Sequence, residues 1–179
     1  MQLGERGAED VSLREVARAA GVSATALYRH FPDKTALLEA LSDEGFARLA
    51  AAQRTAMAAA TGTKVDAFNE MGRAYVRFAL GEPGLFRLMF THTPKHDPLT
   101  IDPDQADASL SMLREKAAEL VPPDQGPAAA QRFALRAWSL VHGLALLLLD
   151  RQVEDDAPMI DAVIDMRDFG LGIGDSARS

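Results

Sequence analysis

A chain of 179 residues of which 47% are apolar can bury a sizeable core, and this composition excludes general disorder. The lack of cysteine excludes disulfides, thiolate zinc sites and cysteine nucleophiles, and it is typical of a reducing cytoplasm. A net charge of −7 argues against nonspecific binding to phosphate backbones.

The sequence gives no sign of export or membrane insertion. Its start, "MQLGERGA", lacks the apolar core of a secretory signal. The longest uncharged stretch, residues 137–149, is shorter than the about 20 apolar residues that a bilayer requires. We therefore predict a soluble cytoplasmic protein without a membrane-spanning segment.

Apolar residues recur at helical spacing along almost the whole chain, which predicts an all-α fold. Ser12 and Glu15 can form a capping box that starts a helix ending at Gly21. Ser23 caps the following helix, which ends at Phe31. These two helices are therefore joined by the short turn Gly-Val-Ser.

The next helices also begin at caps. Asp33 caps a helix that runs to about residue 60, and Thr63 with Asp66 starts another that ends at "GEPG", residues 81–84. A short helix over residues 85–90 precedes a Pro-rich surface loop. We interpret the loop as solvated, because metal-ligand spacing is missing among its potential ligands, which are His92, His96, Asp97, Asp102 and Asp104.

Three helices are predicted in the C-terminal half. The first covers residues 106–117 and is stopped by Pro122, and the second runs from Pro127 to Leu149. The third follows Pro158. Its inward face is predicted to carry Met159, Ala162, Val163, Met166 and Phe169, and its opposite face Asp161, Asp165 and Asp168.

Residues 137–149 are apolar on every side of the predicted helix, apart from Ser139 and His142. A helix that is apolar all round must be buried all round. In a chain of this size one side can face the core of the domain, and the other side most easily faces a second copy. We therefore predict a homodimer that forms through the last two helices.

Two helices joined by a tight turn with glycine are typical of a helix-turn-helix motif. Leu27 and Phe31 anchor one face of the second helix. The opposite face carries Ala24, Thr25, Ala26, Tyr28, Arg29 and His30. Small residues at its start allow close approach to bases, Tyr28 and Arg29 can reach phosphates, and the amides at the start of the Lys34 helix suit a phosphate oxygen. The alternative is an ordinary short helix with a polar face.

The segment "VSLREVARAAGVSATALYRHFPDKTALLEAL", residues 11–41, resembles the DNA-binding region of TetR-family transcriptional regulators. The matching positions are Ser12, Ala17, Ala20, Gly21, Val22, Ser23, Leu27, Tyr28, Phe31 and Lys34. The resemblance implies contacts with a double-stranded DNA operator. Phosphate contacts are implied for Ser12, Tyr28 and Lys34, and base-edge contacts for Ala24, Thr25, Ala26 and His30. Arg14 can join either set.

Two later segments, "EPGLFRLMF" at residues 82–90 and "WSLVHGLALLLLD" at residues 138–150, resemble the family's Trp-x-x-x-His-Gly subgroup. The family implies a helix-turn-helix domain, residues 1–45, joined to a ligand-binding and dimerisation domain, residues 46–179. It also implies a repressor that a small apolar or amphipathic effector releases from a palindromic operator. The candidate cavity residues are Tyr75, Phe78, Phe86, Met89, Phe90, Met112, Leu113, Trp138 and His142, although each by itself is also explained as core.

One departure from the family pattern concerns its first helix. Family members carry a full helix before the position of Glu9, where this sequence has only "MQLGERGA". The first helix is lost, or the start codon is assigned late, or the protein is a weakened DNA binder.

Two other functions remain open. One is a helical ligand-binding module without DNA binding, and the other is a small helical enzyme that uses His142 as a base. The sequence shows no nucleophile motif, phosphate loop or paired carboxylates, so we predict neither catalysis nor a cofactor.

Overall fold

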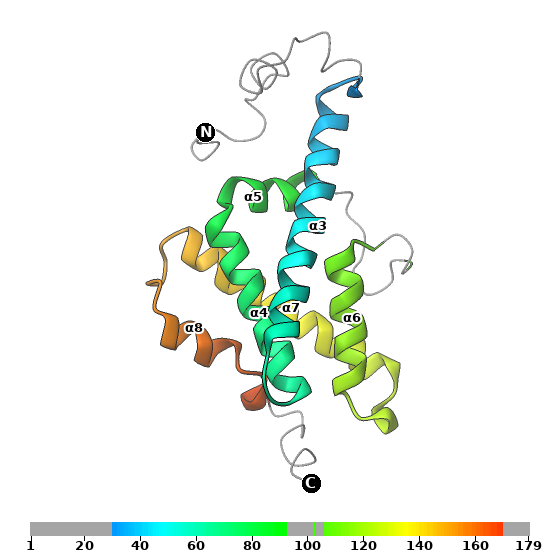
Figure 1. Ribbon diagram of the computed structural model, residues 1–179, viewed down its shortest axis with the longest axis vertical. Coiled ribbons are helices and arrows are strands. Elements are labelled where there is room, and N and C mark those ends of the chain that lie inside the picture. Colours follow the sequence, from blue (N-terminus) through cyan, green and yellow to red (C-terminus); the bar gives the residue numbers. More distant parts are fainter. Residues whose placement is uncertain (1–29, 93–101, 103–105, 170–179) are drawn as a thin grey trace. The chain divides into compact units, whose positions relative to one another are not determined.

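The computed structural model describes residues 30–92, 102 and 106–169, and within them every regular element is a helix, which confirms the all-α fold (Figure 1). The predicted helices that start at Ser12 and Ser23 lie outside the described residues. The α-helices are α3 (Lys34–Ala59), α4 (Lys64–Gly81), α5 (Pro83–His92), α6 (Ala108–Leu120), α7 (Pro127–Leu149) and α8 (Ala157–Ile164). Two 3-10 turns, η2 (Pro123–Gln125) and η3 (Met166–Phe169), complete the set.

The chain divides into two compact units. The first unit contains the described residues of Met1–Gly45 and Glu82–Lys95, and the second contains those of Phe46–Gly81 and His96–Ser179. Helix α3 contributes residues to both units, and α5 belongs to the first. The sequence-based division assigns α5 to the larger domain instead, and that division into functional domains stays a prediction.

The predicted caps of α3 and α4 are confirmed. The Asp33 carboxylate accepts a hydrogen bond from the Ala36 amide at 2.9 Å. The Asp66 carboxylate accepts from the Thr63 amide at 2.7 Å, and the Asp66 amide donates to the Thr63 hydroxyl at 3.3 Å, which completes a capping box. Hydrogen bonds from the Thr63 amide and hydroxyl, and then from Arg167, lower the pKa of Asp66 to about 2.

Within the first unit, α5 packs closely on the first part of α3. The Ser42 hydroxyl donates to the Met89 carbonyl at 3.2 Å, and a Cβ placed on Gly45 would lie only 2.6 Å from Met89 Cγ. Phe86 and Met89 are fully buried, and the Phe86 and Phe90 rings meet edge to face at 5.1 Å. The small residues on α3 therefore make room for the apolar face of α5.

The core of the second unit lies between α4, α6 and α7. Phe68 of α4 and Phe133 of α7 stack with their ring centroids 5.3 Å apart, and both side chains are buried. Ala117 of α6 is fully buried in the same apolar cluster. The Ser109 hydroxyl donates to the Gln53 side-chain oxygen at 2.7 Å, so this buried polar pair is satisfied.

Helix α7 is long and apolar enough to cross a membrane by length and composition. The core helix of a soluble protein has the same properties, and eight α7 side chains are buried in the second unit. Two arginines, Arg132 and Arg136, are exposed in its first half. Packing within the second unit therefore accounts for the apolar character of one face of α7.

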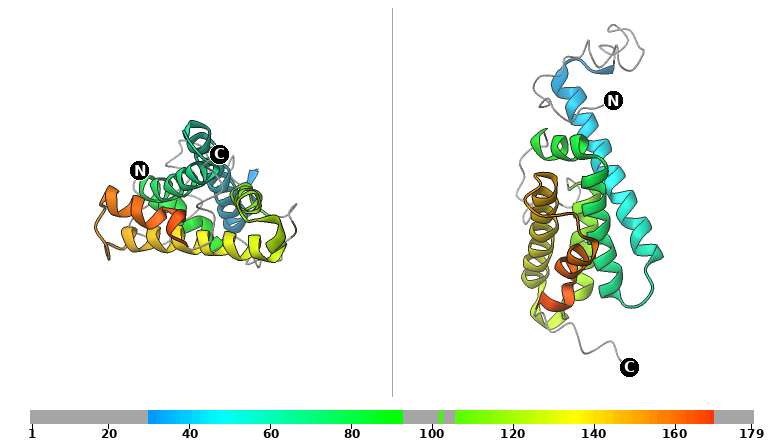
Figure 2. Two further views of the ribbon diagram at one scale, coloured as in Figure 1. Left: turned by 90° about the horizontal axis from the view of Figure 1, so that it is seen from below. Right: turned by 90° about the vertical axis from the view of Figure 1, so that its left-hand side faces the viewer.

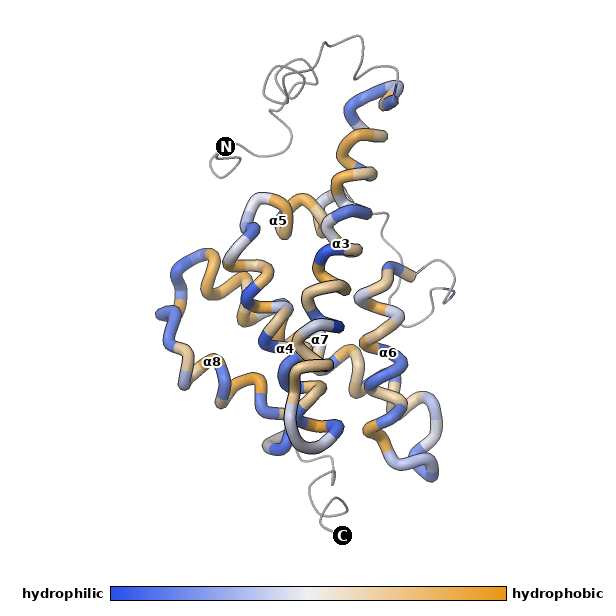
Figure 3. The backbone as a smooth tube through the Cα atoms, in the orientation of Figure 1, coloured by the Kyte–Doolittle hydropathy of each residue, from blue (hydrophilic) through white to orange (hydrophobic). Residues whose placement is uncertain are grey.

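A left-handed residue ends α7. Arg151 has φ 54, the Gln152 amide donates to the Leu147 carbonyl at 2.8 Å, and the Arg151 amide donates to the Leu148 carbonyl at 3.1 Å. These are the two hydrogen bonds of a Schellman motif. The hydrophilic connection that follows separates α7 from α8 (Figure 3).

The prediction of one long final helix is wrong. Helix α8 ends at Ile164, and its buried side chains are Ile160 and Ile164, whereas Ala162 is exposed and Met159 and Val163 are half-buried. Asn69 of α4 accounts for the break, because its side chain bonds to the Asp165 carboxylate at 2.9 Å and accepts from the Met166 amide at 3.1 Å. Helices α4 and α8 consequently lie side by side (Figure 2).

Candidate functional sites

Most of the predicted DNA-contacting residues lie outside the described part of the chain, and these are Ser12, Arg14, Ala24, Thr25, Ala26, Tyr28 and Arg29. The two that are described, His30 and Lys34, lie just before and at the start of α3, and His30 is exposed. The Asp33 carboxylate accepts a hydrogen bond from the Ala36 amide in this first turn, and the predicted phosphate contact at Lys34 stays a prediction.

The nine predicted effector-site residues fall into two groups. Phe86, Met89 and Phe90 belong to the first unit. The other six belong to the second unit, and they are Tyr75, Phe78, Met112, Leu113, Trp138 and His142. Met112 and Leu113 are buried in the apolar cluster of that unit, and Phe78 is half-buried on α4.

Tyr75, Trp138 and His142 form a polar chain between α4 and α7. The Tyr75 hydroxyl lies 2.8 Å from His142 Nδ1, and Trp138 Nε1 donates to the Tyr75 oxygen at 3.3 Å. Because the indole N–H can only donate, we assign the Tyr75 proton to the bond with His142. Nδ1 of His142 is then the acceptor, which makes the neutral ring with its proton on Nε2 the fitting tautomer.

Burial favours the neutral forms of both Tyr75 and His142. Burial raises the pKa of Tyr75, whose side chain is only 3% exposed, and the nearby Asp107 carboxylate adds to the rise. Burial also lowers the pKa of His142. A phenol that resists ionisation and a histidine that resists protonation favour a fixed hydrogen bond over proton transfer, so the arrangement suits binding or structure better than catalysis.

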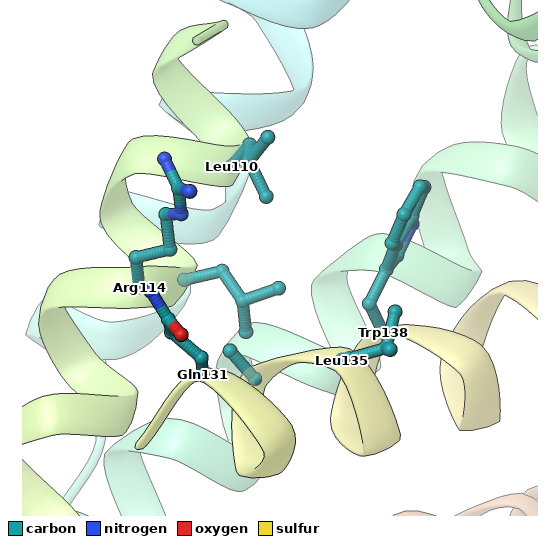
Figure 4. Close-up of a pocket in the computed structure, with 7 residues that line it drawn as sticks. Leu110, Arg114, Gln131, Leu135 and Trp138 are labelled. Atoms are coloured by element: carbon teal, nitrogen blue, oxygen red, sulfur yellow. The ribbon is translucent and has the colours of Figure 1, made fainter. Parts of the chain in front are cut away.

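Trp138 also lines a small groove between α6 and α7 (Figure 4). Its lining is mostly apolar with two polar side chains, and it consists of Leu110, Leu113, Arg114, Gln131, Ala134, Leu135 and Trp138. The groove encloses only about 10 Å³, which is room for about one water molecule. A drug-sized ligand needs a pocket of about 300 Å³ or more, so one wall would have to move.

Only two of the nine predicted effector-site residues, Leu113 and Trp138, line this groove. Sequence reasoning missed its other walls because they are ordinary helix positions. Leu110 and Arg114 are four residues apart, which is the spacing of any helix face. Arg114 and Gln131 belong to different helices, so only the packing of α6 on α7 brings both side chains to the groove.

The outer face of α7 carries a stripe of residues four apart, Ser139, Gly143 and Leu147. Leu147 is 46% exposed, which is unusual for a large apolar side chain, and a Cβ added to Gly143 would meet no atom within 4 Å. An open, partly apolar helix stripe with a glycine at its centre allows another helix to approach closely.

Potential metal ligands do not gather in the described residues, where no group of three histidine, aspartate or glutamate side chains could hold an ion. The loop histidine His96 and the neighbouring Asp97 and Asp104 lie outside the described residues.

Two family models match the chain. The model for bacterial regulatory proteins of the tetR family matches residues 1–41. The model for the tetracyclin repressor-like C-terminal domain matches residues 68–166, which is more than half of the chain.

Several individual proteins are also similar to this chain in sequence or in fold. A protein of unknown function from Rhodococcus sp. RHA1 is 32% identical, with a TM-score of 0.70 over 90% of this chain and 83% of that one. The TetR family transcriptional regulator PfmR from Thermus thermophilus shares the fold at 21% identity, with a TM-score of 0.55 over 91% of this chain and 88% of that one. Nucleoid occlusion factor SlmA from Pasteurella multocida is 36% identical over 88 residues, 49% of this chain and 44% of the relative. The matched segment therefore spans less than half the length of that relative.

Proposed function

Because the chain belongs to the TetR family of bacterial regulatory proteins, we propose that it represses transcription by binding as a homodimer to a palindromic operator, from which a small apolar or amphipathic molecule releases it. The observation that carries this proposal is the pair of family matches, over residues 1–41 and 68–166. Together they support a DNA-binding segment followed by a regulatory domain in one chain.

Two of the predicted operator contacts, His30 and Lys34, lie around the start of α3. His30 is exposed there, and Lys34 is the first residue of the helix, where a cation beside backbone amides suits a phosphate. The net charge of −7 argues against nonspecific binding, because few cations are available for phosphate neutralisation along a whole surface.

Dimerisation is proposed through α7 and α8. The stripe of Ser139, Gly143 and Leu147 is open, and α8 adds the exposed Ala162 and the half-buried Met159. Two copies related by a two-fold axis would pair these helices as a four-helix contact. A dimer presents two recognition helices, and their half-sites on DNA would lie about 34 Å apart, which is one helical turn.

Effector release requires a link between the regulatory domain and the DNA-binding segment. Helix α3 is that link by chain continuity, because its 26 residues are shared by both compact units. An effector would act only by binding one arrangement of α3 more tightly than the other.

Selection from a pool of random duplexes tests the DNA-binding part of the proposal. The protein should enrich an inverted repeat whose half-sites lie one turn apart. Enrichment of single half-sites would contradict dimeric recognition. Recovery of unrelated sequences with equal affinity would contradict operator binding and favour the alternative, a ligand-binding module without DNA binding. A reporter behind the selected sequence should be silenced by the protein, and stimulation of that reporter would contradict the repressor role.

A further inference from the structure

Helix α7 carries opposite charges at its two ends. Helices α4, α6 and α8 pack on α7 from one side, and the described residues of the second unit leave its other side open (Figure 2). Arg132 and Arg136 are exposed in the first half of α7, and in the described residues neither has an ion-pair partner. The connection that follows α7, residues 150–156, is acidic, and Glu154 and Asp155 are exposed in it. One copy therefore offers a cation-rich start and an acidic end.

The open stripe of Ser139, Gly143 and Leu147 lies between these charged ends and on the same face as the two arginines. An α-helix has 3.6 residues per turn, so Arg132, Arg136 and the stripe fall within about a quarter of a turn of one another. The outward face of α7 is therefore cationic at its start, small and apolar at its centre, and followed by acidic residues at its end.

Two-fold symmetry allows this face to meet its own copy in two ways. With the axis along the helices, the two copies of α7 are parallel and each residue faces itself, so Arg132 and Arg136 oppose their own copies and repel. With the axis perpendicular to the helices, the copies are antiparallel and the cationic start of one faces the acidic end of the other. The helix dipoles also favour this second pairing. Charge therefore selects antiparallel helices.

Gly143 sets the register of the antiparallel pair. A Cβ added there would meet no atom within 4 Å, and a residue without a side chain allows a second helix backbone to come close. If the helices cross at Gly143, Ser139 faces the partner's Leu147, because each is four residues from the crossing. Arg132 lies eleven residues before the crossing and Glu154 eleven residues after it. Each arginine end then reaches the acidic connection of the other copy.

We propose that α7 pairs antiparallel with α7 of a second copy, that the two helices cross at Gly143, and that Arg132 and Arg136 are attracted to the acidic connection, residues 150–156, of the partner. This inference rests on the dimer of the proposed function and adds the direction and register of its central contact. A shallow crossing of about 20°, as in four-helix bundles, keeps the helix ends within reach of long arginine side chains. The same charges disfavour partners whose helix lacks an acidic end.

Disulfide cross-linking tests the crossing point, because the sequence contains no cysteine. A residue at the crossing faces its own copy, so Gly143→Cys should form an inter-chain disulfide when the protein is oxidised. Gly81→Cys is the matched control, since a Cβ at Gly81 also meets no atom within 4 Å, and it should stay uncross-linked on a non-reducing gel. Equal cross-linking at the two positions, or none at Gly143, would overturn the register.

Two further positions distinguish antiparallel from parallel pairing. In the antiparallel register Ser139 and its own copy lie about 12 Å apart along the helices, because each is four residues from the crossing. A disulfide spans Cα atoms about 7 Å apart at most. Ser139→Cys and Leu147→Cys should therefore fail to cross-link separately, whereas a mixture of the two variants should cross-link. Cross-linking of either variant by itself, or failure of the mixture, would contradict the antiparallel arrangement.

Charge reversal tests the attraction between the helix ends. Arg132→Glu combined with Arg136→Glu should weaken the dimer about tenfold in sedimentation experiments. Adding Glu154→Arg and Asp155→Arg to the same chain should restore most of the affinity, because both ends are then reversed together. Arg54→Glu changes an exposed arginine of α3 and should leave the dimer unchanged. A loss that the second pair of changes does not restore would contradict the pairing.

Sedimentation of the unmodified protein separates this inference from the proposed function. A protein that stays monomeric at all concentrations would reject both the proposed dimer and its register, and would assign the open face to a different partner. A dimer that does not cross-link through Gly143→Cys would retain the dimer of the proposed function and reject only the crossing at Gly143. Dimerisation together with cross-linking through Gly143→Cys and through the mixed pair is the result that we expect.

Discussion

The Tyr75 hydroxyl lies 2.8 Å from His142 Nδ1, and this bond joins the middle of α4 to the middle of α7. Trp138 donates to the same hydroxyl, so the Tyr75 proton is committed to His142 and the ring nitrogen must be unprotonated. The strength of the bond therefore depends on pH.

We predict that the protein loses stability as the pH falls through the ordinary histidine range. Burial lowers the pKa of His142 in the folded protein, so below its ordinary value of 6.5 the unfolded chain binds a proton that the folded chain resists. The free energy of unfolding should decrease from about pH 7.5 to about pH 5.5. His142→Asn retains a possible acceptor and cannot titrate, so chemical denaturation should show a smaller decrease in this variant. An equal or larger decrease would contradict the assignment.

Asn69 should be essential for holding the C-terminal segment on α4. Its side chain is 1% exposed and accepts from the Met166 amide, so Asn69→Leu leaves that buried amide without an acceptor. We expect a loss of roughly 1–3 kcal/mol in the free energy of unfolding and faster hydrogen exchange at Met166. Gln152→Leu, an exposed polar-to-apolar change, is the control and should change the free energy by less than about 0.5 kcal/mol. Similar losses for both variants would show that Asn69 has no special role.

Leu147 and Leu41 provide a matched test of the dimer. Both are large apolar side chains with substantial exposure, 46% and 37%, but only Leu147 lies on the proposed α7 interface. Leu147→Glu should convert the dimer to monomer in sedimentation experiments, because it places two like charges at a symmetric contact. Leu41→Glu should leave the dimer intact. Dissociation by both variants, or by neither, would place the interface elsewhere.

Local signals predicted the helix starts because capping is decided by residues three apart. The Thr63 and Asp66 capping box is an example, because the sequence alone predicts it and the fold contains it. The end of α8 was not predictable in this way. Asp165 continues the helical pattern in the sequence, but in the fold Asn69, which is 96 residues away, binds its carboxylate. Ile160 and Ile164 are four apart and share the buried face of α8, so local spacing accounts for that face but not for the end of the helix.

In the candidate sites, too, local spacing predicts some features, and contacts between helices determine the others. Trp138 and His142 are four apart in the sequence, which places both on one face of a helix. The link of these residues to Tyr75, and the position of Arg114 and Gln131 in one groove, each involve different helices. Periodicity within a single helix cannot predict such contacts.

The most direct test of the central claim compares two lysines that each begin a helix, Lys34 of α3 and Lys64 of α4. Lys64 is 70% exposed, so Lys64→Ala is the matched control for the same change of charge. Fluorescence anisotropy on the selected duplex should show affinity that falls with salt. Lys34→Ala should weaken binding and reduce the salt slope by about one, while Lys64→Ala leaves both unchanged. Equal effects of the two substitutions, or binding that does not depend on salt, would contradict operator recognition by the segment that ends at Lys34.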